Sequence, residues 1–225
     1  MKNEFLDLVS SPLMNLDHTY RYSGTKLVEP ESLSQHIMDT VMLGLKIIDE
    51  ANHLAGKEVL DPNVYVMKAI FHDLEEVITG DIPRPLKYYD KDTTASMKHV
   101  AEEVAYRFFE KEFHQVNTCY DLWESAKHGD EGFILKLVDT FVVVSKTLKE
   151  VSLLHNYYML RVAHEVSQYL KEVLDGFMWN CPITSQAVSM YLKELIEGAL
   201  ASMEKLLEDN QEIMYDFNIS SQSMI

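Results

Sequence analysis

The sequence predicts an all-helical protein that folds as one unit. Eight Gly and six Pro among 225 residues are few for a turn-rich sandwich, and no segment shows the strict apolar alternation of a strand. Apolar residues instead recur at helical spacing along most of the chain. With 47% hydrophobic residues, the chain can bury roughly 70 to 75% of its unfolded surface in one core. We therefore expect a single domain over residues 1–215 and a disordered tail over residues 216–225.

Eight helices are expected from this periodicity and from capping signals, at residues 4–17, 33–53, 63–79, 92–114, 119–128, 131–154, 157–174 and 184–209. Ser32 and Gln35 form a capping box for the second helix. Asp61 followed by Pro62 is typical of the start of the third helix, and Gly80 of its end. Asp130 is expected to cap the helix over residues 131–154.

The most unusual stretch is residues 71–83, where ionisable side chains interrupt an apolar helical pattern. Successive helix residues are 100° apart, so His72, Asp73 and Glu76 would share one side, with Glu76 one turn beyond His72. These charges border the interior and need a partner, and a divalent cation would be sufficient. Residues 81–85 contain two prolines, which predicts a stiff loop over this side of the helix.

Three further residues stand out. His36 falls in the first turn of the helix over residues 33–53, near the core, where a hydrogen-bonded core histidine is the simpler alternative. Asp139 lies in the middle of a helix that is apolar nearly all round, and an unpaired buried carboxylate costs several kcal/mol. It must be protonated, paired or bound to a metal. Arg21 lies in an aperiodic connection, residues 18–30, where an exposed arginine is the simpler alternative.

Taken together, His36, His72, Asp73 and Asp139 offer two nitrogen and two oxygen ligands from three predicted helices. This set suits Zn, Mn, Co, Fe or Ni, and the order of metal affinities does not choose among them. The order His, His-Asp, Asp along a helical chain resembles the HD superfamily of metal-dependent phosphohydrolases.

The residues after His72-Asp73 narrow the resemblance. The run Glu-Glu-Val-Ile-Thr-Gly-Asp-Ile-Pro-Arg-Pro-Leu-Lys-Tyr, residues 75–88, is similar to the signature of the YfbR-like 5'-deoxynucleotidases. Arg21 precedes His36 by fifteen residues, as an Arg does in that branch, and Ser34-Gln35-His36 resembles its Ser-Glu-His. The similarity extends from about Arg21 to about Lys149. It implies an all-α HD-domain helical bundle with a metal site between helices, acting as a dimeric enzyme on deoxyribonucleoside 5'-monophosphates.

The resemblance also implies roles for single residues. The metal ligands would be His36, His72, Asp73 and Asp139, the acid-base residue Glu76, the phosphate binder Arg21, and a further active-site carboxylate Asp81. Two positions depart from the family. Gln35 replaces the usual Glu, and Tyr22 stands where related enzymes can carry Trp beside the sugar. Lys87 is a possible second cation for the substrate, or else a solvated loop lysine.

The composition limits which partners the protein can bind and where in the cell we expect it. The formal charge of −16, from 36 acids and 20 bases, argues against binding a nucleic-acid polymer, whereas a small anion would need a local cationic pocket. No apolar run approaches the roughly 18 residues of a membrane span. The first residues carry acids where a signal peptide would be basic, so we expect a cytoplasmic protein. Cys119 and Cys181 have no CxxC spacing and are expected to be reduced thiols.

Two other functions are open. Other HD enzymes resemble this chain in the same four ligands. A deoxynucleoside triphosphate triphosphohydrolase, for example one acting on dATP, is therefore the main alternative. A non-catalytic helical protein that binds a nucleotide or a structural metal is the second. The loop over residues 80–83 and the spacing of Arg21 favour the monophosphate branch, and Glu76 with Arg21 argues against a purely structural site. We expect a small nucleotide substrate and a homodimer.

Overall fold

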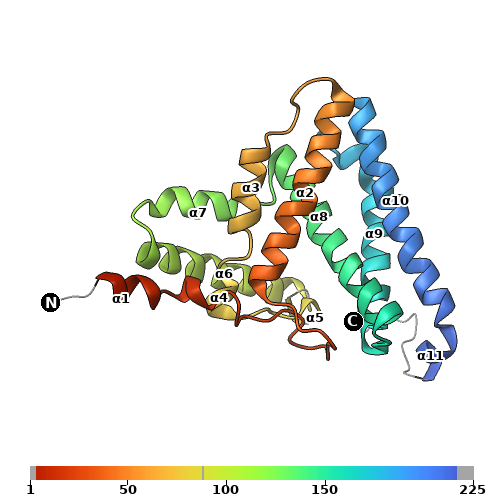
Figure 1. The fold of residues 1–225 in the computed structure, drawn as a ribbon, viewed down its shortest axis with the longest axis horizontal. Coiled ribbons are helices and arrows are strands. Elements are labelled where there is room, and N and C mark those ends of the chain that lie inside the picture. Colours follow the sequence, from red (N-terminus) through yellow and green to blue (C-terminus); the bar gives the residue numbers. More distant parts are fainter. Residues whose placement is uncertain (1–3, 88, 217–225) are drawn as a thin grey trace.

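The computed structural model describes residues 4–87 and 89–216, and it is built from helices (Figure 1). The helices are α1 Glu4–Val9, α2 Leu33–Ala55, α3 Pro62–Phe71, α4 Glu76–Thr79, α5 Arg84–Lys87, α6 Lys91–Glu112, α7 Val116–Glu124, α8 Gly129–Leu148, α9 Leu160–Asn180, α10 Gln186–Asp209 and α11 Gln211–Asp216. Short 3-10 helices span Pro12–Asn15 and Tyr157–Met159, and one π-helical turn spans Lys149–Leu153. Within the described residues, the only β pairing is an isolated bridge between Tyr20 and Ser32. The predicted all-α class is confirmed.

Helix α2 connects the two halves of the core. It packs against α3, α8 and α10, while α9 packs against α10 and α8 and α6 packs against α7. Figure 1 shows the long α9 and α10 on one side of α2 and α8, with α3, α6 and α7 on the other. One apolar cluster fills the side of α9 and α10, around Ile48, Leu135 and Leu192. A second, around Leu33, Phe71 and Phe109, joins the start of α2 to α6 and α7.

Most predicted helix ends agree with the structure. Ser32 Oγ accepts the Gln35 N–H at 3.3 Å, and the Asp61 carboxylate accepts the Asn63 N–H at 2.7 Å. Gly80 follows α4 with a φ of 69°, a conformation that glycine adopts without a Cβ clash. The prediction for Asp130 is wrong, because α8 begins at Gly129 and Asp130 lies inside its first turn.

Several predicted helices differ in their extent. The helix expected over residues 119–128 is α7, which begins at Val116 and ends at Glu124, and the one expected over 131–154 is α8 followed by the π-helical turn. The helix expected over residues 4–17 is divided, since α1 ends at Val9 and a separate 3-10 helix begins at Pro12, which has no N–H to continue the first. The helix expected over 63–79 breaks after Phe71. Helix α9 continues through Gly176 to Asn180 instead of ending at residue 174. The first residue of the predicted tail, Asp216, is instead the last residue of α11, and the rest of that tail lies outside the described residues.

No helix within residues 4–87 and 89–216 is both long enough and apolar enough to cross a bilayer. Both cysteines are free thiols, as the sequence predicts.

A buried carboxylate fixes the segment that precedes α2. Glu150, in the π-helical turn after α8, is fully buried. Its two oxygens accept the backbone N–H groups of Val28 and Glu29, at 2.9 and 3.0 Å. They also accept the Asn156 amide at 2.6 Å and lie 3.1 Å from Lys146 Nζ. These bonds outweigh burial and lower the pKa of Glu150 to about 2.

The ionised Glu150 carboxylate is expected to stabilise the fold. Glu150→Gln should lower the free energy of unfolding at pH 7 by about 3 kcal/mol, since the lowered pKa means that the folded protein stabilises the ionised form. This contribution is complete above the unfolded pKa of Glu and is lost as the pH falls through about 2. Urea unfolding of both proteins from pH 7 to pH 3 measures it, with exposed Glu172→Gln as the control. A difference that did not shrink in acid would contradict the role of the charge.

Candidate metal and substrate site

Four metal-ligating side chains meet between α2, α3 and α8. His36 lies in the first turn of α2, His72 and Asp73 directly follow the last residue of α3, and Asp139 lies in the middle of α8. One ligand atom from each of these residues lies within 4.8 Å of the others. The structure therefore brings together the four residues that the sequence selects.

The two histidines are oriented as metal ligands are. His72 Nδ1 lies 2.7 Å from the Ala69 carbonyl oxygen, which can only accept, so Nδ1 donates a proton there and Nε2 is the nitrogen that faces the cluster. His72 Nε2 is 2.9 Å from Asp73 Oδ2, and His36 Nε2 is 3.3 Å from Asp139 Oδ1. Both Nε2 atoms are buried and neither has a hydrogen-bond partner among the described residues. Because unpartnered buried nitrogens are unfavourable, this donor set fits a divalent transition metal.

Glu31, a buried carboxylate beside His36, supports the same assignment. Glu31 is 3% exposed and its Oε1 lies 3.6 Å from His36 Nδ1. A carboxylate beside the second ring nitrogen is the usual way in which a metal-binding histidine is oriented.

Lys127 places a positive charge between the two ligand carboxylates. Its Nζ is 3.1 Å from Asp139 Oδ2 and 3.8 Å from Asp73 Oδ1. Burial would raise the pKa of Asp139, but the charges of Lys127, His36 and Arg21 hold it well below its usual range. Burial would likewise raise the pKa of Asp73, and His72 and Lys127 lower it. Both carboxylates are therefore ionised at neutral pH, as metal binding requires.

The break after α3 changes how Glu76 reaches the site. The N–H of Leu74 donates to the Phe71 carbonyl and that of Glu76 to the Asp73 carbonyl, both between residues three apart. Side chains at this spacing eclipse in a 3-10 turn, so Glu76 lies over Asp73. The sequence prediction of Glu76 one α-helical turn beyond His72 is therefore wrong. The tighter turn buries Leu74 and Glu75, and Glu75 Oε2 accepts the Trp123 indole N–H at 2.6 Å.

Glu76 combines burial with a missing partner. Its Oε2 is buried without a hydrogen bond, and the side chain lines the cavity beside the metal-ligand cluster. Burial raises the pKa of Glu76 above its ordinary value, and the charge of Asp73 raises it further, although Arg21 opposes this. Glu76 therefore keeps its proton to a higher pH than an exposed glutamate does.

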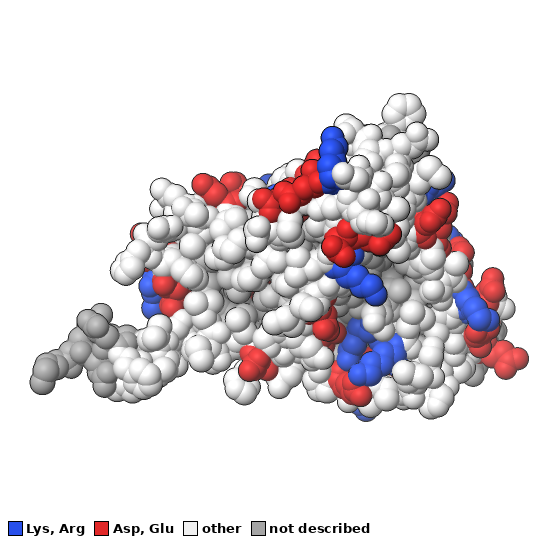
Figure 2. Space-filling view, turned by 45° about the horizontal axis from the view of Figure 1, so that its top comes forward, with Lys and Arg blue, Asp and Glu red and all other residues white. Residues whose placement is uncertain are grey.

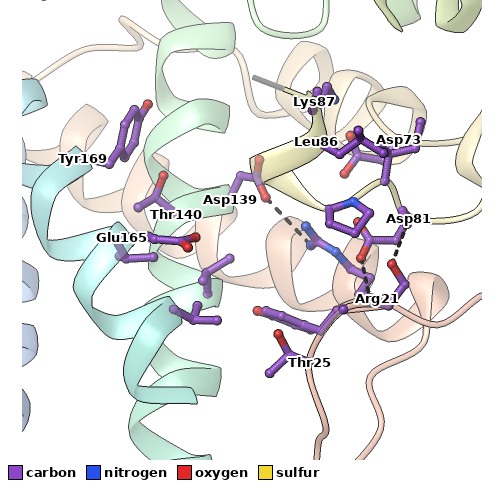
Figure 3. A pocket seen from close by; sticks show the side chains of 18 of the residues that line it. Arg21, Thr25, Asp73, Asp81, Leu86, Lys87, Asp139, Thr140, Glu165 and Tyr169 are labelled. Atoms are coloured by element: carbon purple, nitrogen blue, oxygen red, sulfur yellow. Dashed lines mark hydrogen bonds and ion pairs between the residues drawn. The ribbon is translucent and has the colours of Figure 1, made fainter. Parts of the chain in front are cut away.

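A cavity of about 570 Å³ adjoins the cluster, within the range of small-molecule sites. Its walls come from the segment over residues 21–25, the segment over 81–87, α8 and α9 (Figure 3). The loop predicted over residues 81–85 is shorter, because α5 begins at Arg84. Seven residues that the sequence selects line it, namely Arg21, Tyr22, Asp73, Glu76, Asp81, Lys87 and Asp139. His36 and His72 lie behind this surface.

Arg21 is buried at the cluster, which corrects the simpler interpretation as a surface residue. Its side chain is 14% exposed, and its Nη1 lies 3.9 Å from Asp139 Oδ1 (Figure 3). That nitrogen is buried without a hydrogen-bond partner. The backbone N–H of Arg21 donates to the Glu31 carbonyl at 2.9 Å, which holds the segment against the start of α2.

Tyr22 and Asp81 shape the same end of the cavity. Tyr22 has a φ of 61°, a left-handed conformation that bulky residues rarely adopt. Asp81 Oδ2 accepts the Ser23 N–H at 3.2 Å, and Ser23 Oγ donates to the Asp81 carbonyl at 2.9 Å. Asp81, just before α5, thus holds the segment that presents Arg21. Lys87 is exposed at the rim.

Several lining residues were not predicted. Lys136 precedes Asp139 by three residues on α8, a spacing that could have revealed it. Lys127 follows α7 without any periodic signal, and the α9 residues belong to the last third of the chain. In Figure 2 several Lys and Arg side chains gather where this face is hollowed. The acidic chain therefore has local basic groups of the kind that a small anionic substrate needs.

The all-helical fold, with His36, His72-Asp73 and Asp139 between three helices, defines an HD-domain phosphohydrolase. Two solved structures share the fold. An HD-domain phosphohydrolase from Listeria innocua superposes with a TM-score of 0.69 at 21% identity, covering 95% of this chain and 97% of that one. An HD phosphohydrolase of cyanophage S-2L, bound to dA and one catalytic Zn²⁺ ion, superposes with a TM-score of 0.54 at 15% identity, covering 85% of this chain and 96% of that one.

The chain belongs to the YfbR-like 5'-deoxynucleotidase family, whose model matches residues 9–199. This match extends well beyond the stretch from about Arg21 to about Lys149 in which the resemblance is evident by eye. Among curated relatives, the 5'-deoxynucleotidase of Erwinia tasmaniensis is 28% identical over 165 residues, 70% of this chain and 82% of the relative. The 5'-deoxynucleotidase of Vibrio parahaemolyticus is 28% identical over 135 residues, 59% of this chain and 69% of the relative.

Proposed function

We propose that the protein is a metal-dependent 5'-deoxynucleotidase, which hydrolyses deoxyribonucleoside 5'-monophosphates to deoxynucleoside and phosphate. The observation that carries this proposal is the position of Arg21. A buried guanidinium nitrogen without a hydrogen-bond partner lies 3.9 Å from a ligand carboxylate, and the Arg21 side chain lines the cavity. Guanidinium groups suit phosphate oxygens, so a phosphate bound there would lie beside the metal-ligand cluster. The names of the curated relatives support the same substrate class.

The residues of the chain suggest how the reaction proceeds. A divalent cation held by His36, His72, Asp73 and Asp139 supplies Lewis acidity and an acidified water when bound. Water attacks phosphorus, the bond to the 5' oxygen breaks, and that oxygen takes up a proton. Glu76 is placed to deliver this proton, because its pKa is raised and its Oε2 has no other partner. The proton lost by the attacking water then restores the acid.

The finer assignments are also proposals. We propose that the ion is Co, Mn, Zn, Ni or Fe, and the zinc ion of the cyanophage enzyme supports zinc among these. We assign Arg21, Tyr22, Asp81 and Lys87 to substrate binding, since all four line the cavity. A homodimer is proposed from the family resemblance alone, and the cytoplasmic location stays a prediction from the sequence.

The test is a panel of substrates after chelation and re-addition of single metals. Deoxyribonucleoside monophosphates should release free phosphate, and the metal that restores the highest rate identifies the preferred ion. Release of tripolyphosphate from deoxynucleoside triphosphates would instead identify a triphosphohydrolase. No turnover with any metal would indicate a non-catalytic protein that binds a nucleotide or a structural metal. Ribonucleotides in the same panel test whether the enzyme still distinguishes ribose from deoxyribose with Tyr22 at the position where related enzymes can carry Trp.

Arg21→Lys should lower kcat/KM for a deoxynucleoside monophosphate on the order of 10- to 100-fold. The ammonium group keeps the charge but loses the paired N–H donors of the planar guanidinium. Steady-state kinetics measure the effect, and Arg107→Lys, a change to an exposed residue of α6, is the matched control. Equal kinetics for Arg21→Lys and the wild type would remove Arg21 from phosphate binding.

A further inference from the structure

One wall of the cavity has no role in the chemistry described above. It is formed by α9, where Val162, Glu165, Val166 and Tyr169 recur at the spacing of one helix face. Figure 3 shows Glu165 and Tyr169 across the cavity from Arg21 and Asp81, with Thr140 of α8 beside Glu165. A ligand whose phosphate lies at Arg21 therefore extends its other end toward α9.

This wall combines apolar surface with one oriented carboxylate. Val162 and Val166 offer aliphatic surface and Tyr169 an aromatic ring, which suit the faces of a planar base. Arg161 Nε donates to Glu165 Oε1 at 3.0 Å, and both side chains line the cavity. This pair restricts the Glu165 side chain, and Figure 3 shows its carboxylate directed toward the cavity.

The orientation of the ligand follows from Arg21. Its buried guanidinium nitrogen has no hydrogen-bond partner, whereas the Arg161 Nε at the opposite wall already donates to Glu165. The phosphate therefore belongs at the Arg21 end, and the base belongs at the Glu165 end.

We propose that the α9 wall is the base subsite and that Glu165 makes it select guanine. An ionised carboxylate accepts hydrogen bonds and donates none. Guanine presents two adjacent donors, N1–H and the 2-amino group, which can meet both oxygens of one carboxylate. Adenine and cytosine present one amino group beside an acceptor, and thymine places its single N–H between two carbonyls. This inference rests on the proposed function, because it takes a deoxynucleoside monophosphate as the substrate.

The test compares kcat/KM for dGMP, dIMP, dAMP, dCMP and dTMP. The wild type should prefer dGMP, and dIMP, which differs only in lacking the 2-amino group, should be about 10-fold poorer, since a paired contact to a base is worth a discrimination of this order. In Glu165→Gln the preference for dGMP over dIMP should largely disappear, because the amide oxygen accepts only one of the two donors.

Glu172→Gln, on the same helix but exposed and outside the cavity wall, should keep the wild-type order of substrates. Equal kcat/KM for dGMP and dIMP in the wild type would overturn the inference, as would an unchanged dGMP preference in Glu165→Gln. Either result would leave the proposed function intact if phosphate is still released from the panel. Absence of phosphate release from every monophosphate would overturn the proposed function itself, and equilibrium binding of deoxyguanosine and deoxyinosine would then test the subsite alone.

Discussion

Asp139→Ala should lose the metal and the activity together. Asp139 is the one predicted ligand from α8, and its carboxylate also holds Lys127 at 3.1 Å and Arg21 at 3.9 Å. Removing it deletes a ligand and leaves two cations without their partner. Lewis acidity contributes several kcal/mol to such reactions and each 1.4 kcal/mol is tenfold in rate, so kcat should fall on the order of 1,000-fold.

Metal content by elemental analysis and phosphate release measure this result on the same preparation. Asp139→Asn keeps the side-chain volume and one possible ligand oxygen, and should retain more metal than the alanine variant. Asp49→Ala, at an exposed position of α2, is the control and should keep both properties. A folded Asp139→Ala protein with full metal and full activity would exclude the four-residue site.

Glu76→Gln should keep the metal and lose turnover. Glu76 lines the cavity but is not one of the four clustered ligands, and glutamine keeps its shape without a transferable proton. General acid-base catalysis typically contributes 10²- to 10⁴-fold, so kcat should fall within this range. In the wild type, kcat should fall at alkaline pH as Glu76 loses its proton. This alkaline limb of the pH profile should be absent from Glu76→Gln. Wild-type kcat in a metal-loaded Glu76→Gln protein would show that another group moves the proton.

Stability gives a second measurement on the same variant. The folded protein raises the pKa of Glu76 above its unfolded value, so the protonated form is the one that folding favours. The contribution to stability is present below the unfolded pKa and is lost as the pH rises through the folded pKa. Glu76→Gln should therefore be more stable than the chelated wild type at pH 8, and the two should become more alike in acid. Urea unfolding at both pH values measures this difference.

The sequence predicted which four residues cluster between α2, α3 and α8, because each one breaks a strong pattern. Asp139 is a charge in an apolar helix, and His72-Asp73 ends an apolar stripe, so their types and positions were visible without contacts. The break after Phe71 was not visible, because the 3-10 turn depends on burying Leu74 and Glu75 against α6 and α7. Tertiary packing decides such turns, and local propensity does not.

The substrate side was only partly predictable. Arg21 looked like a surface residue from its own neighbours, and the bonds that hold its segment in place come from Asp81, Glu31 and the distant Glu150. Lys127 and Glu165 are ordinary charged residues of amphipathic segments until the fold places them in one cavity. The family signature over residues 75–88 lies beside the metal-ligand cluster. The opposite wall of the cavity belongs to α9, which lies outside that signature.

Glu150 has a consequence for the order in which the chain becomes ordered. The N-terminal segment that presents Arg21 is made first on the ribosome, but its backbone donors at Val28 and Glu29 are satisfied by a residue 122 and 121 positions later. The segment can take its final place only after α8 and the turn beyond it have formed. During vectorial synthesis, when N-terminal parts usually fold first, the phosphate-binding segment should therefore be among the last parts to settle.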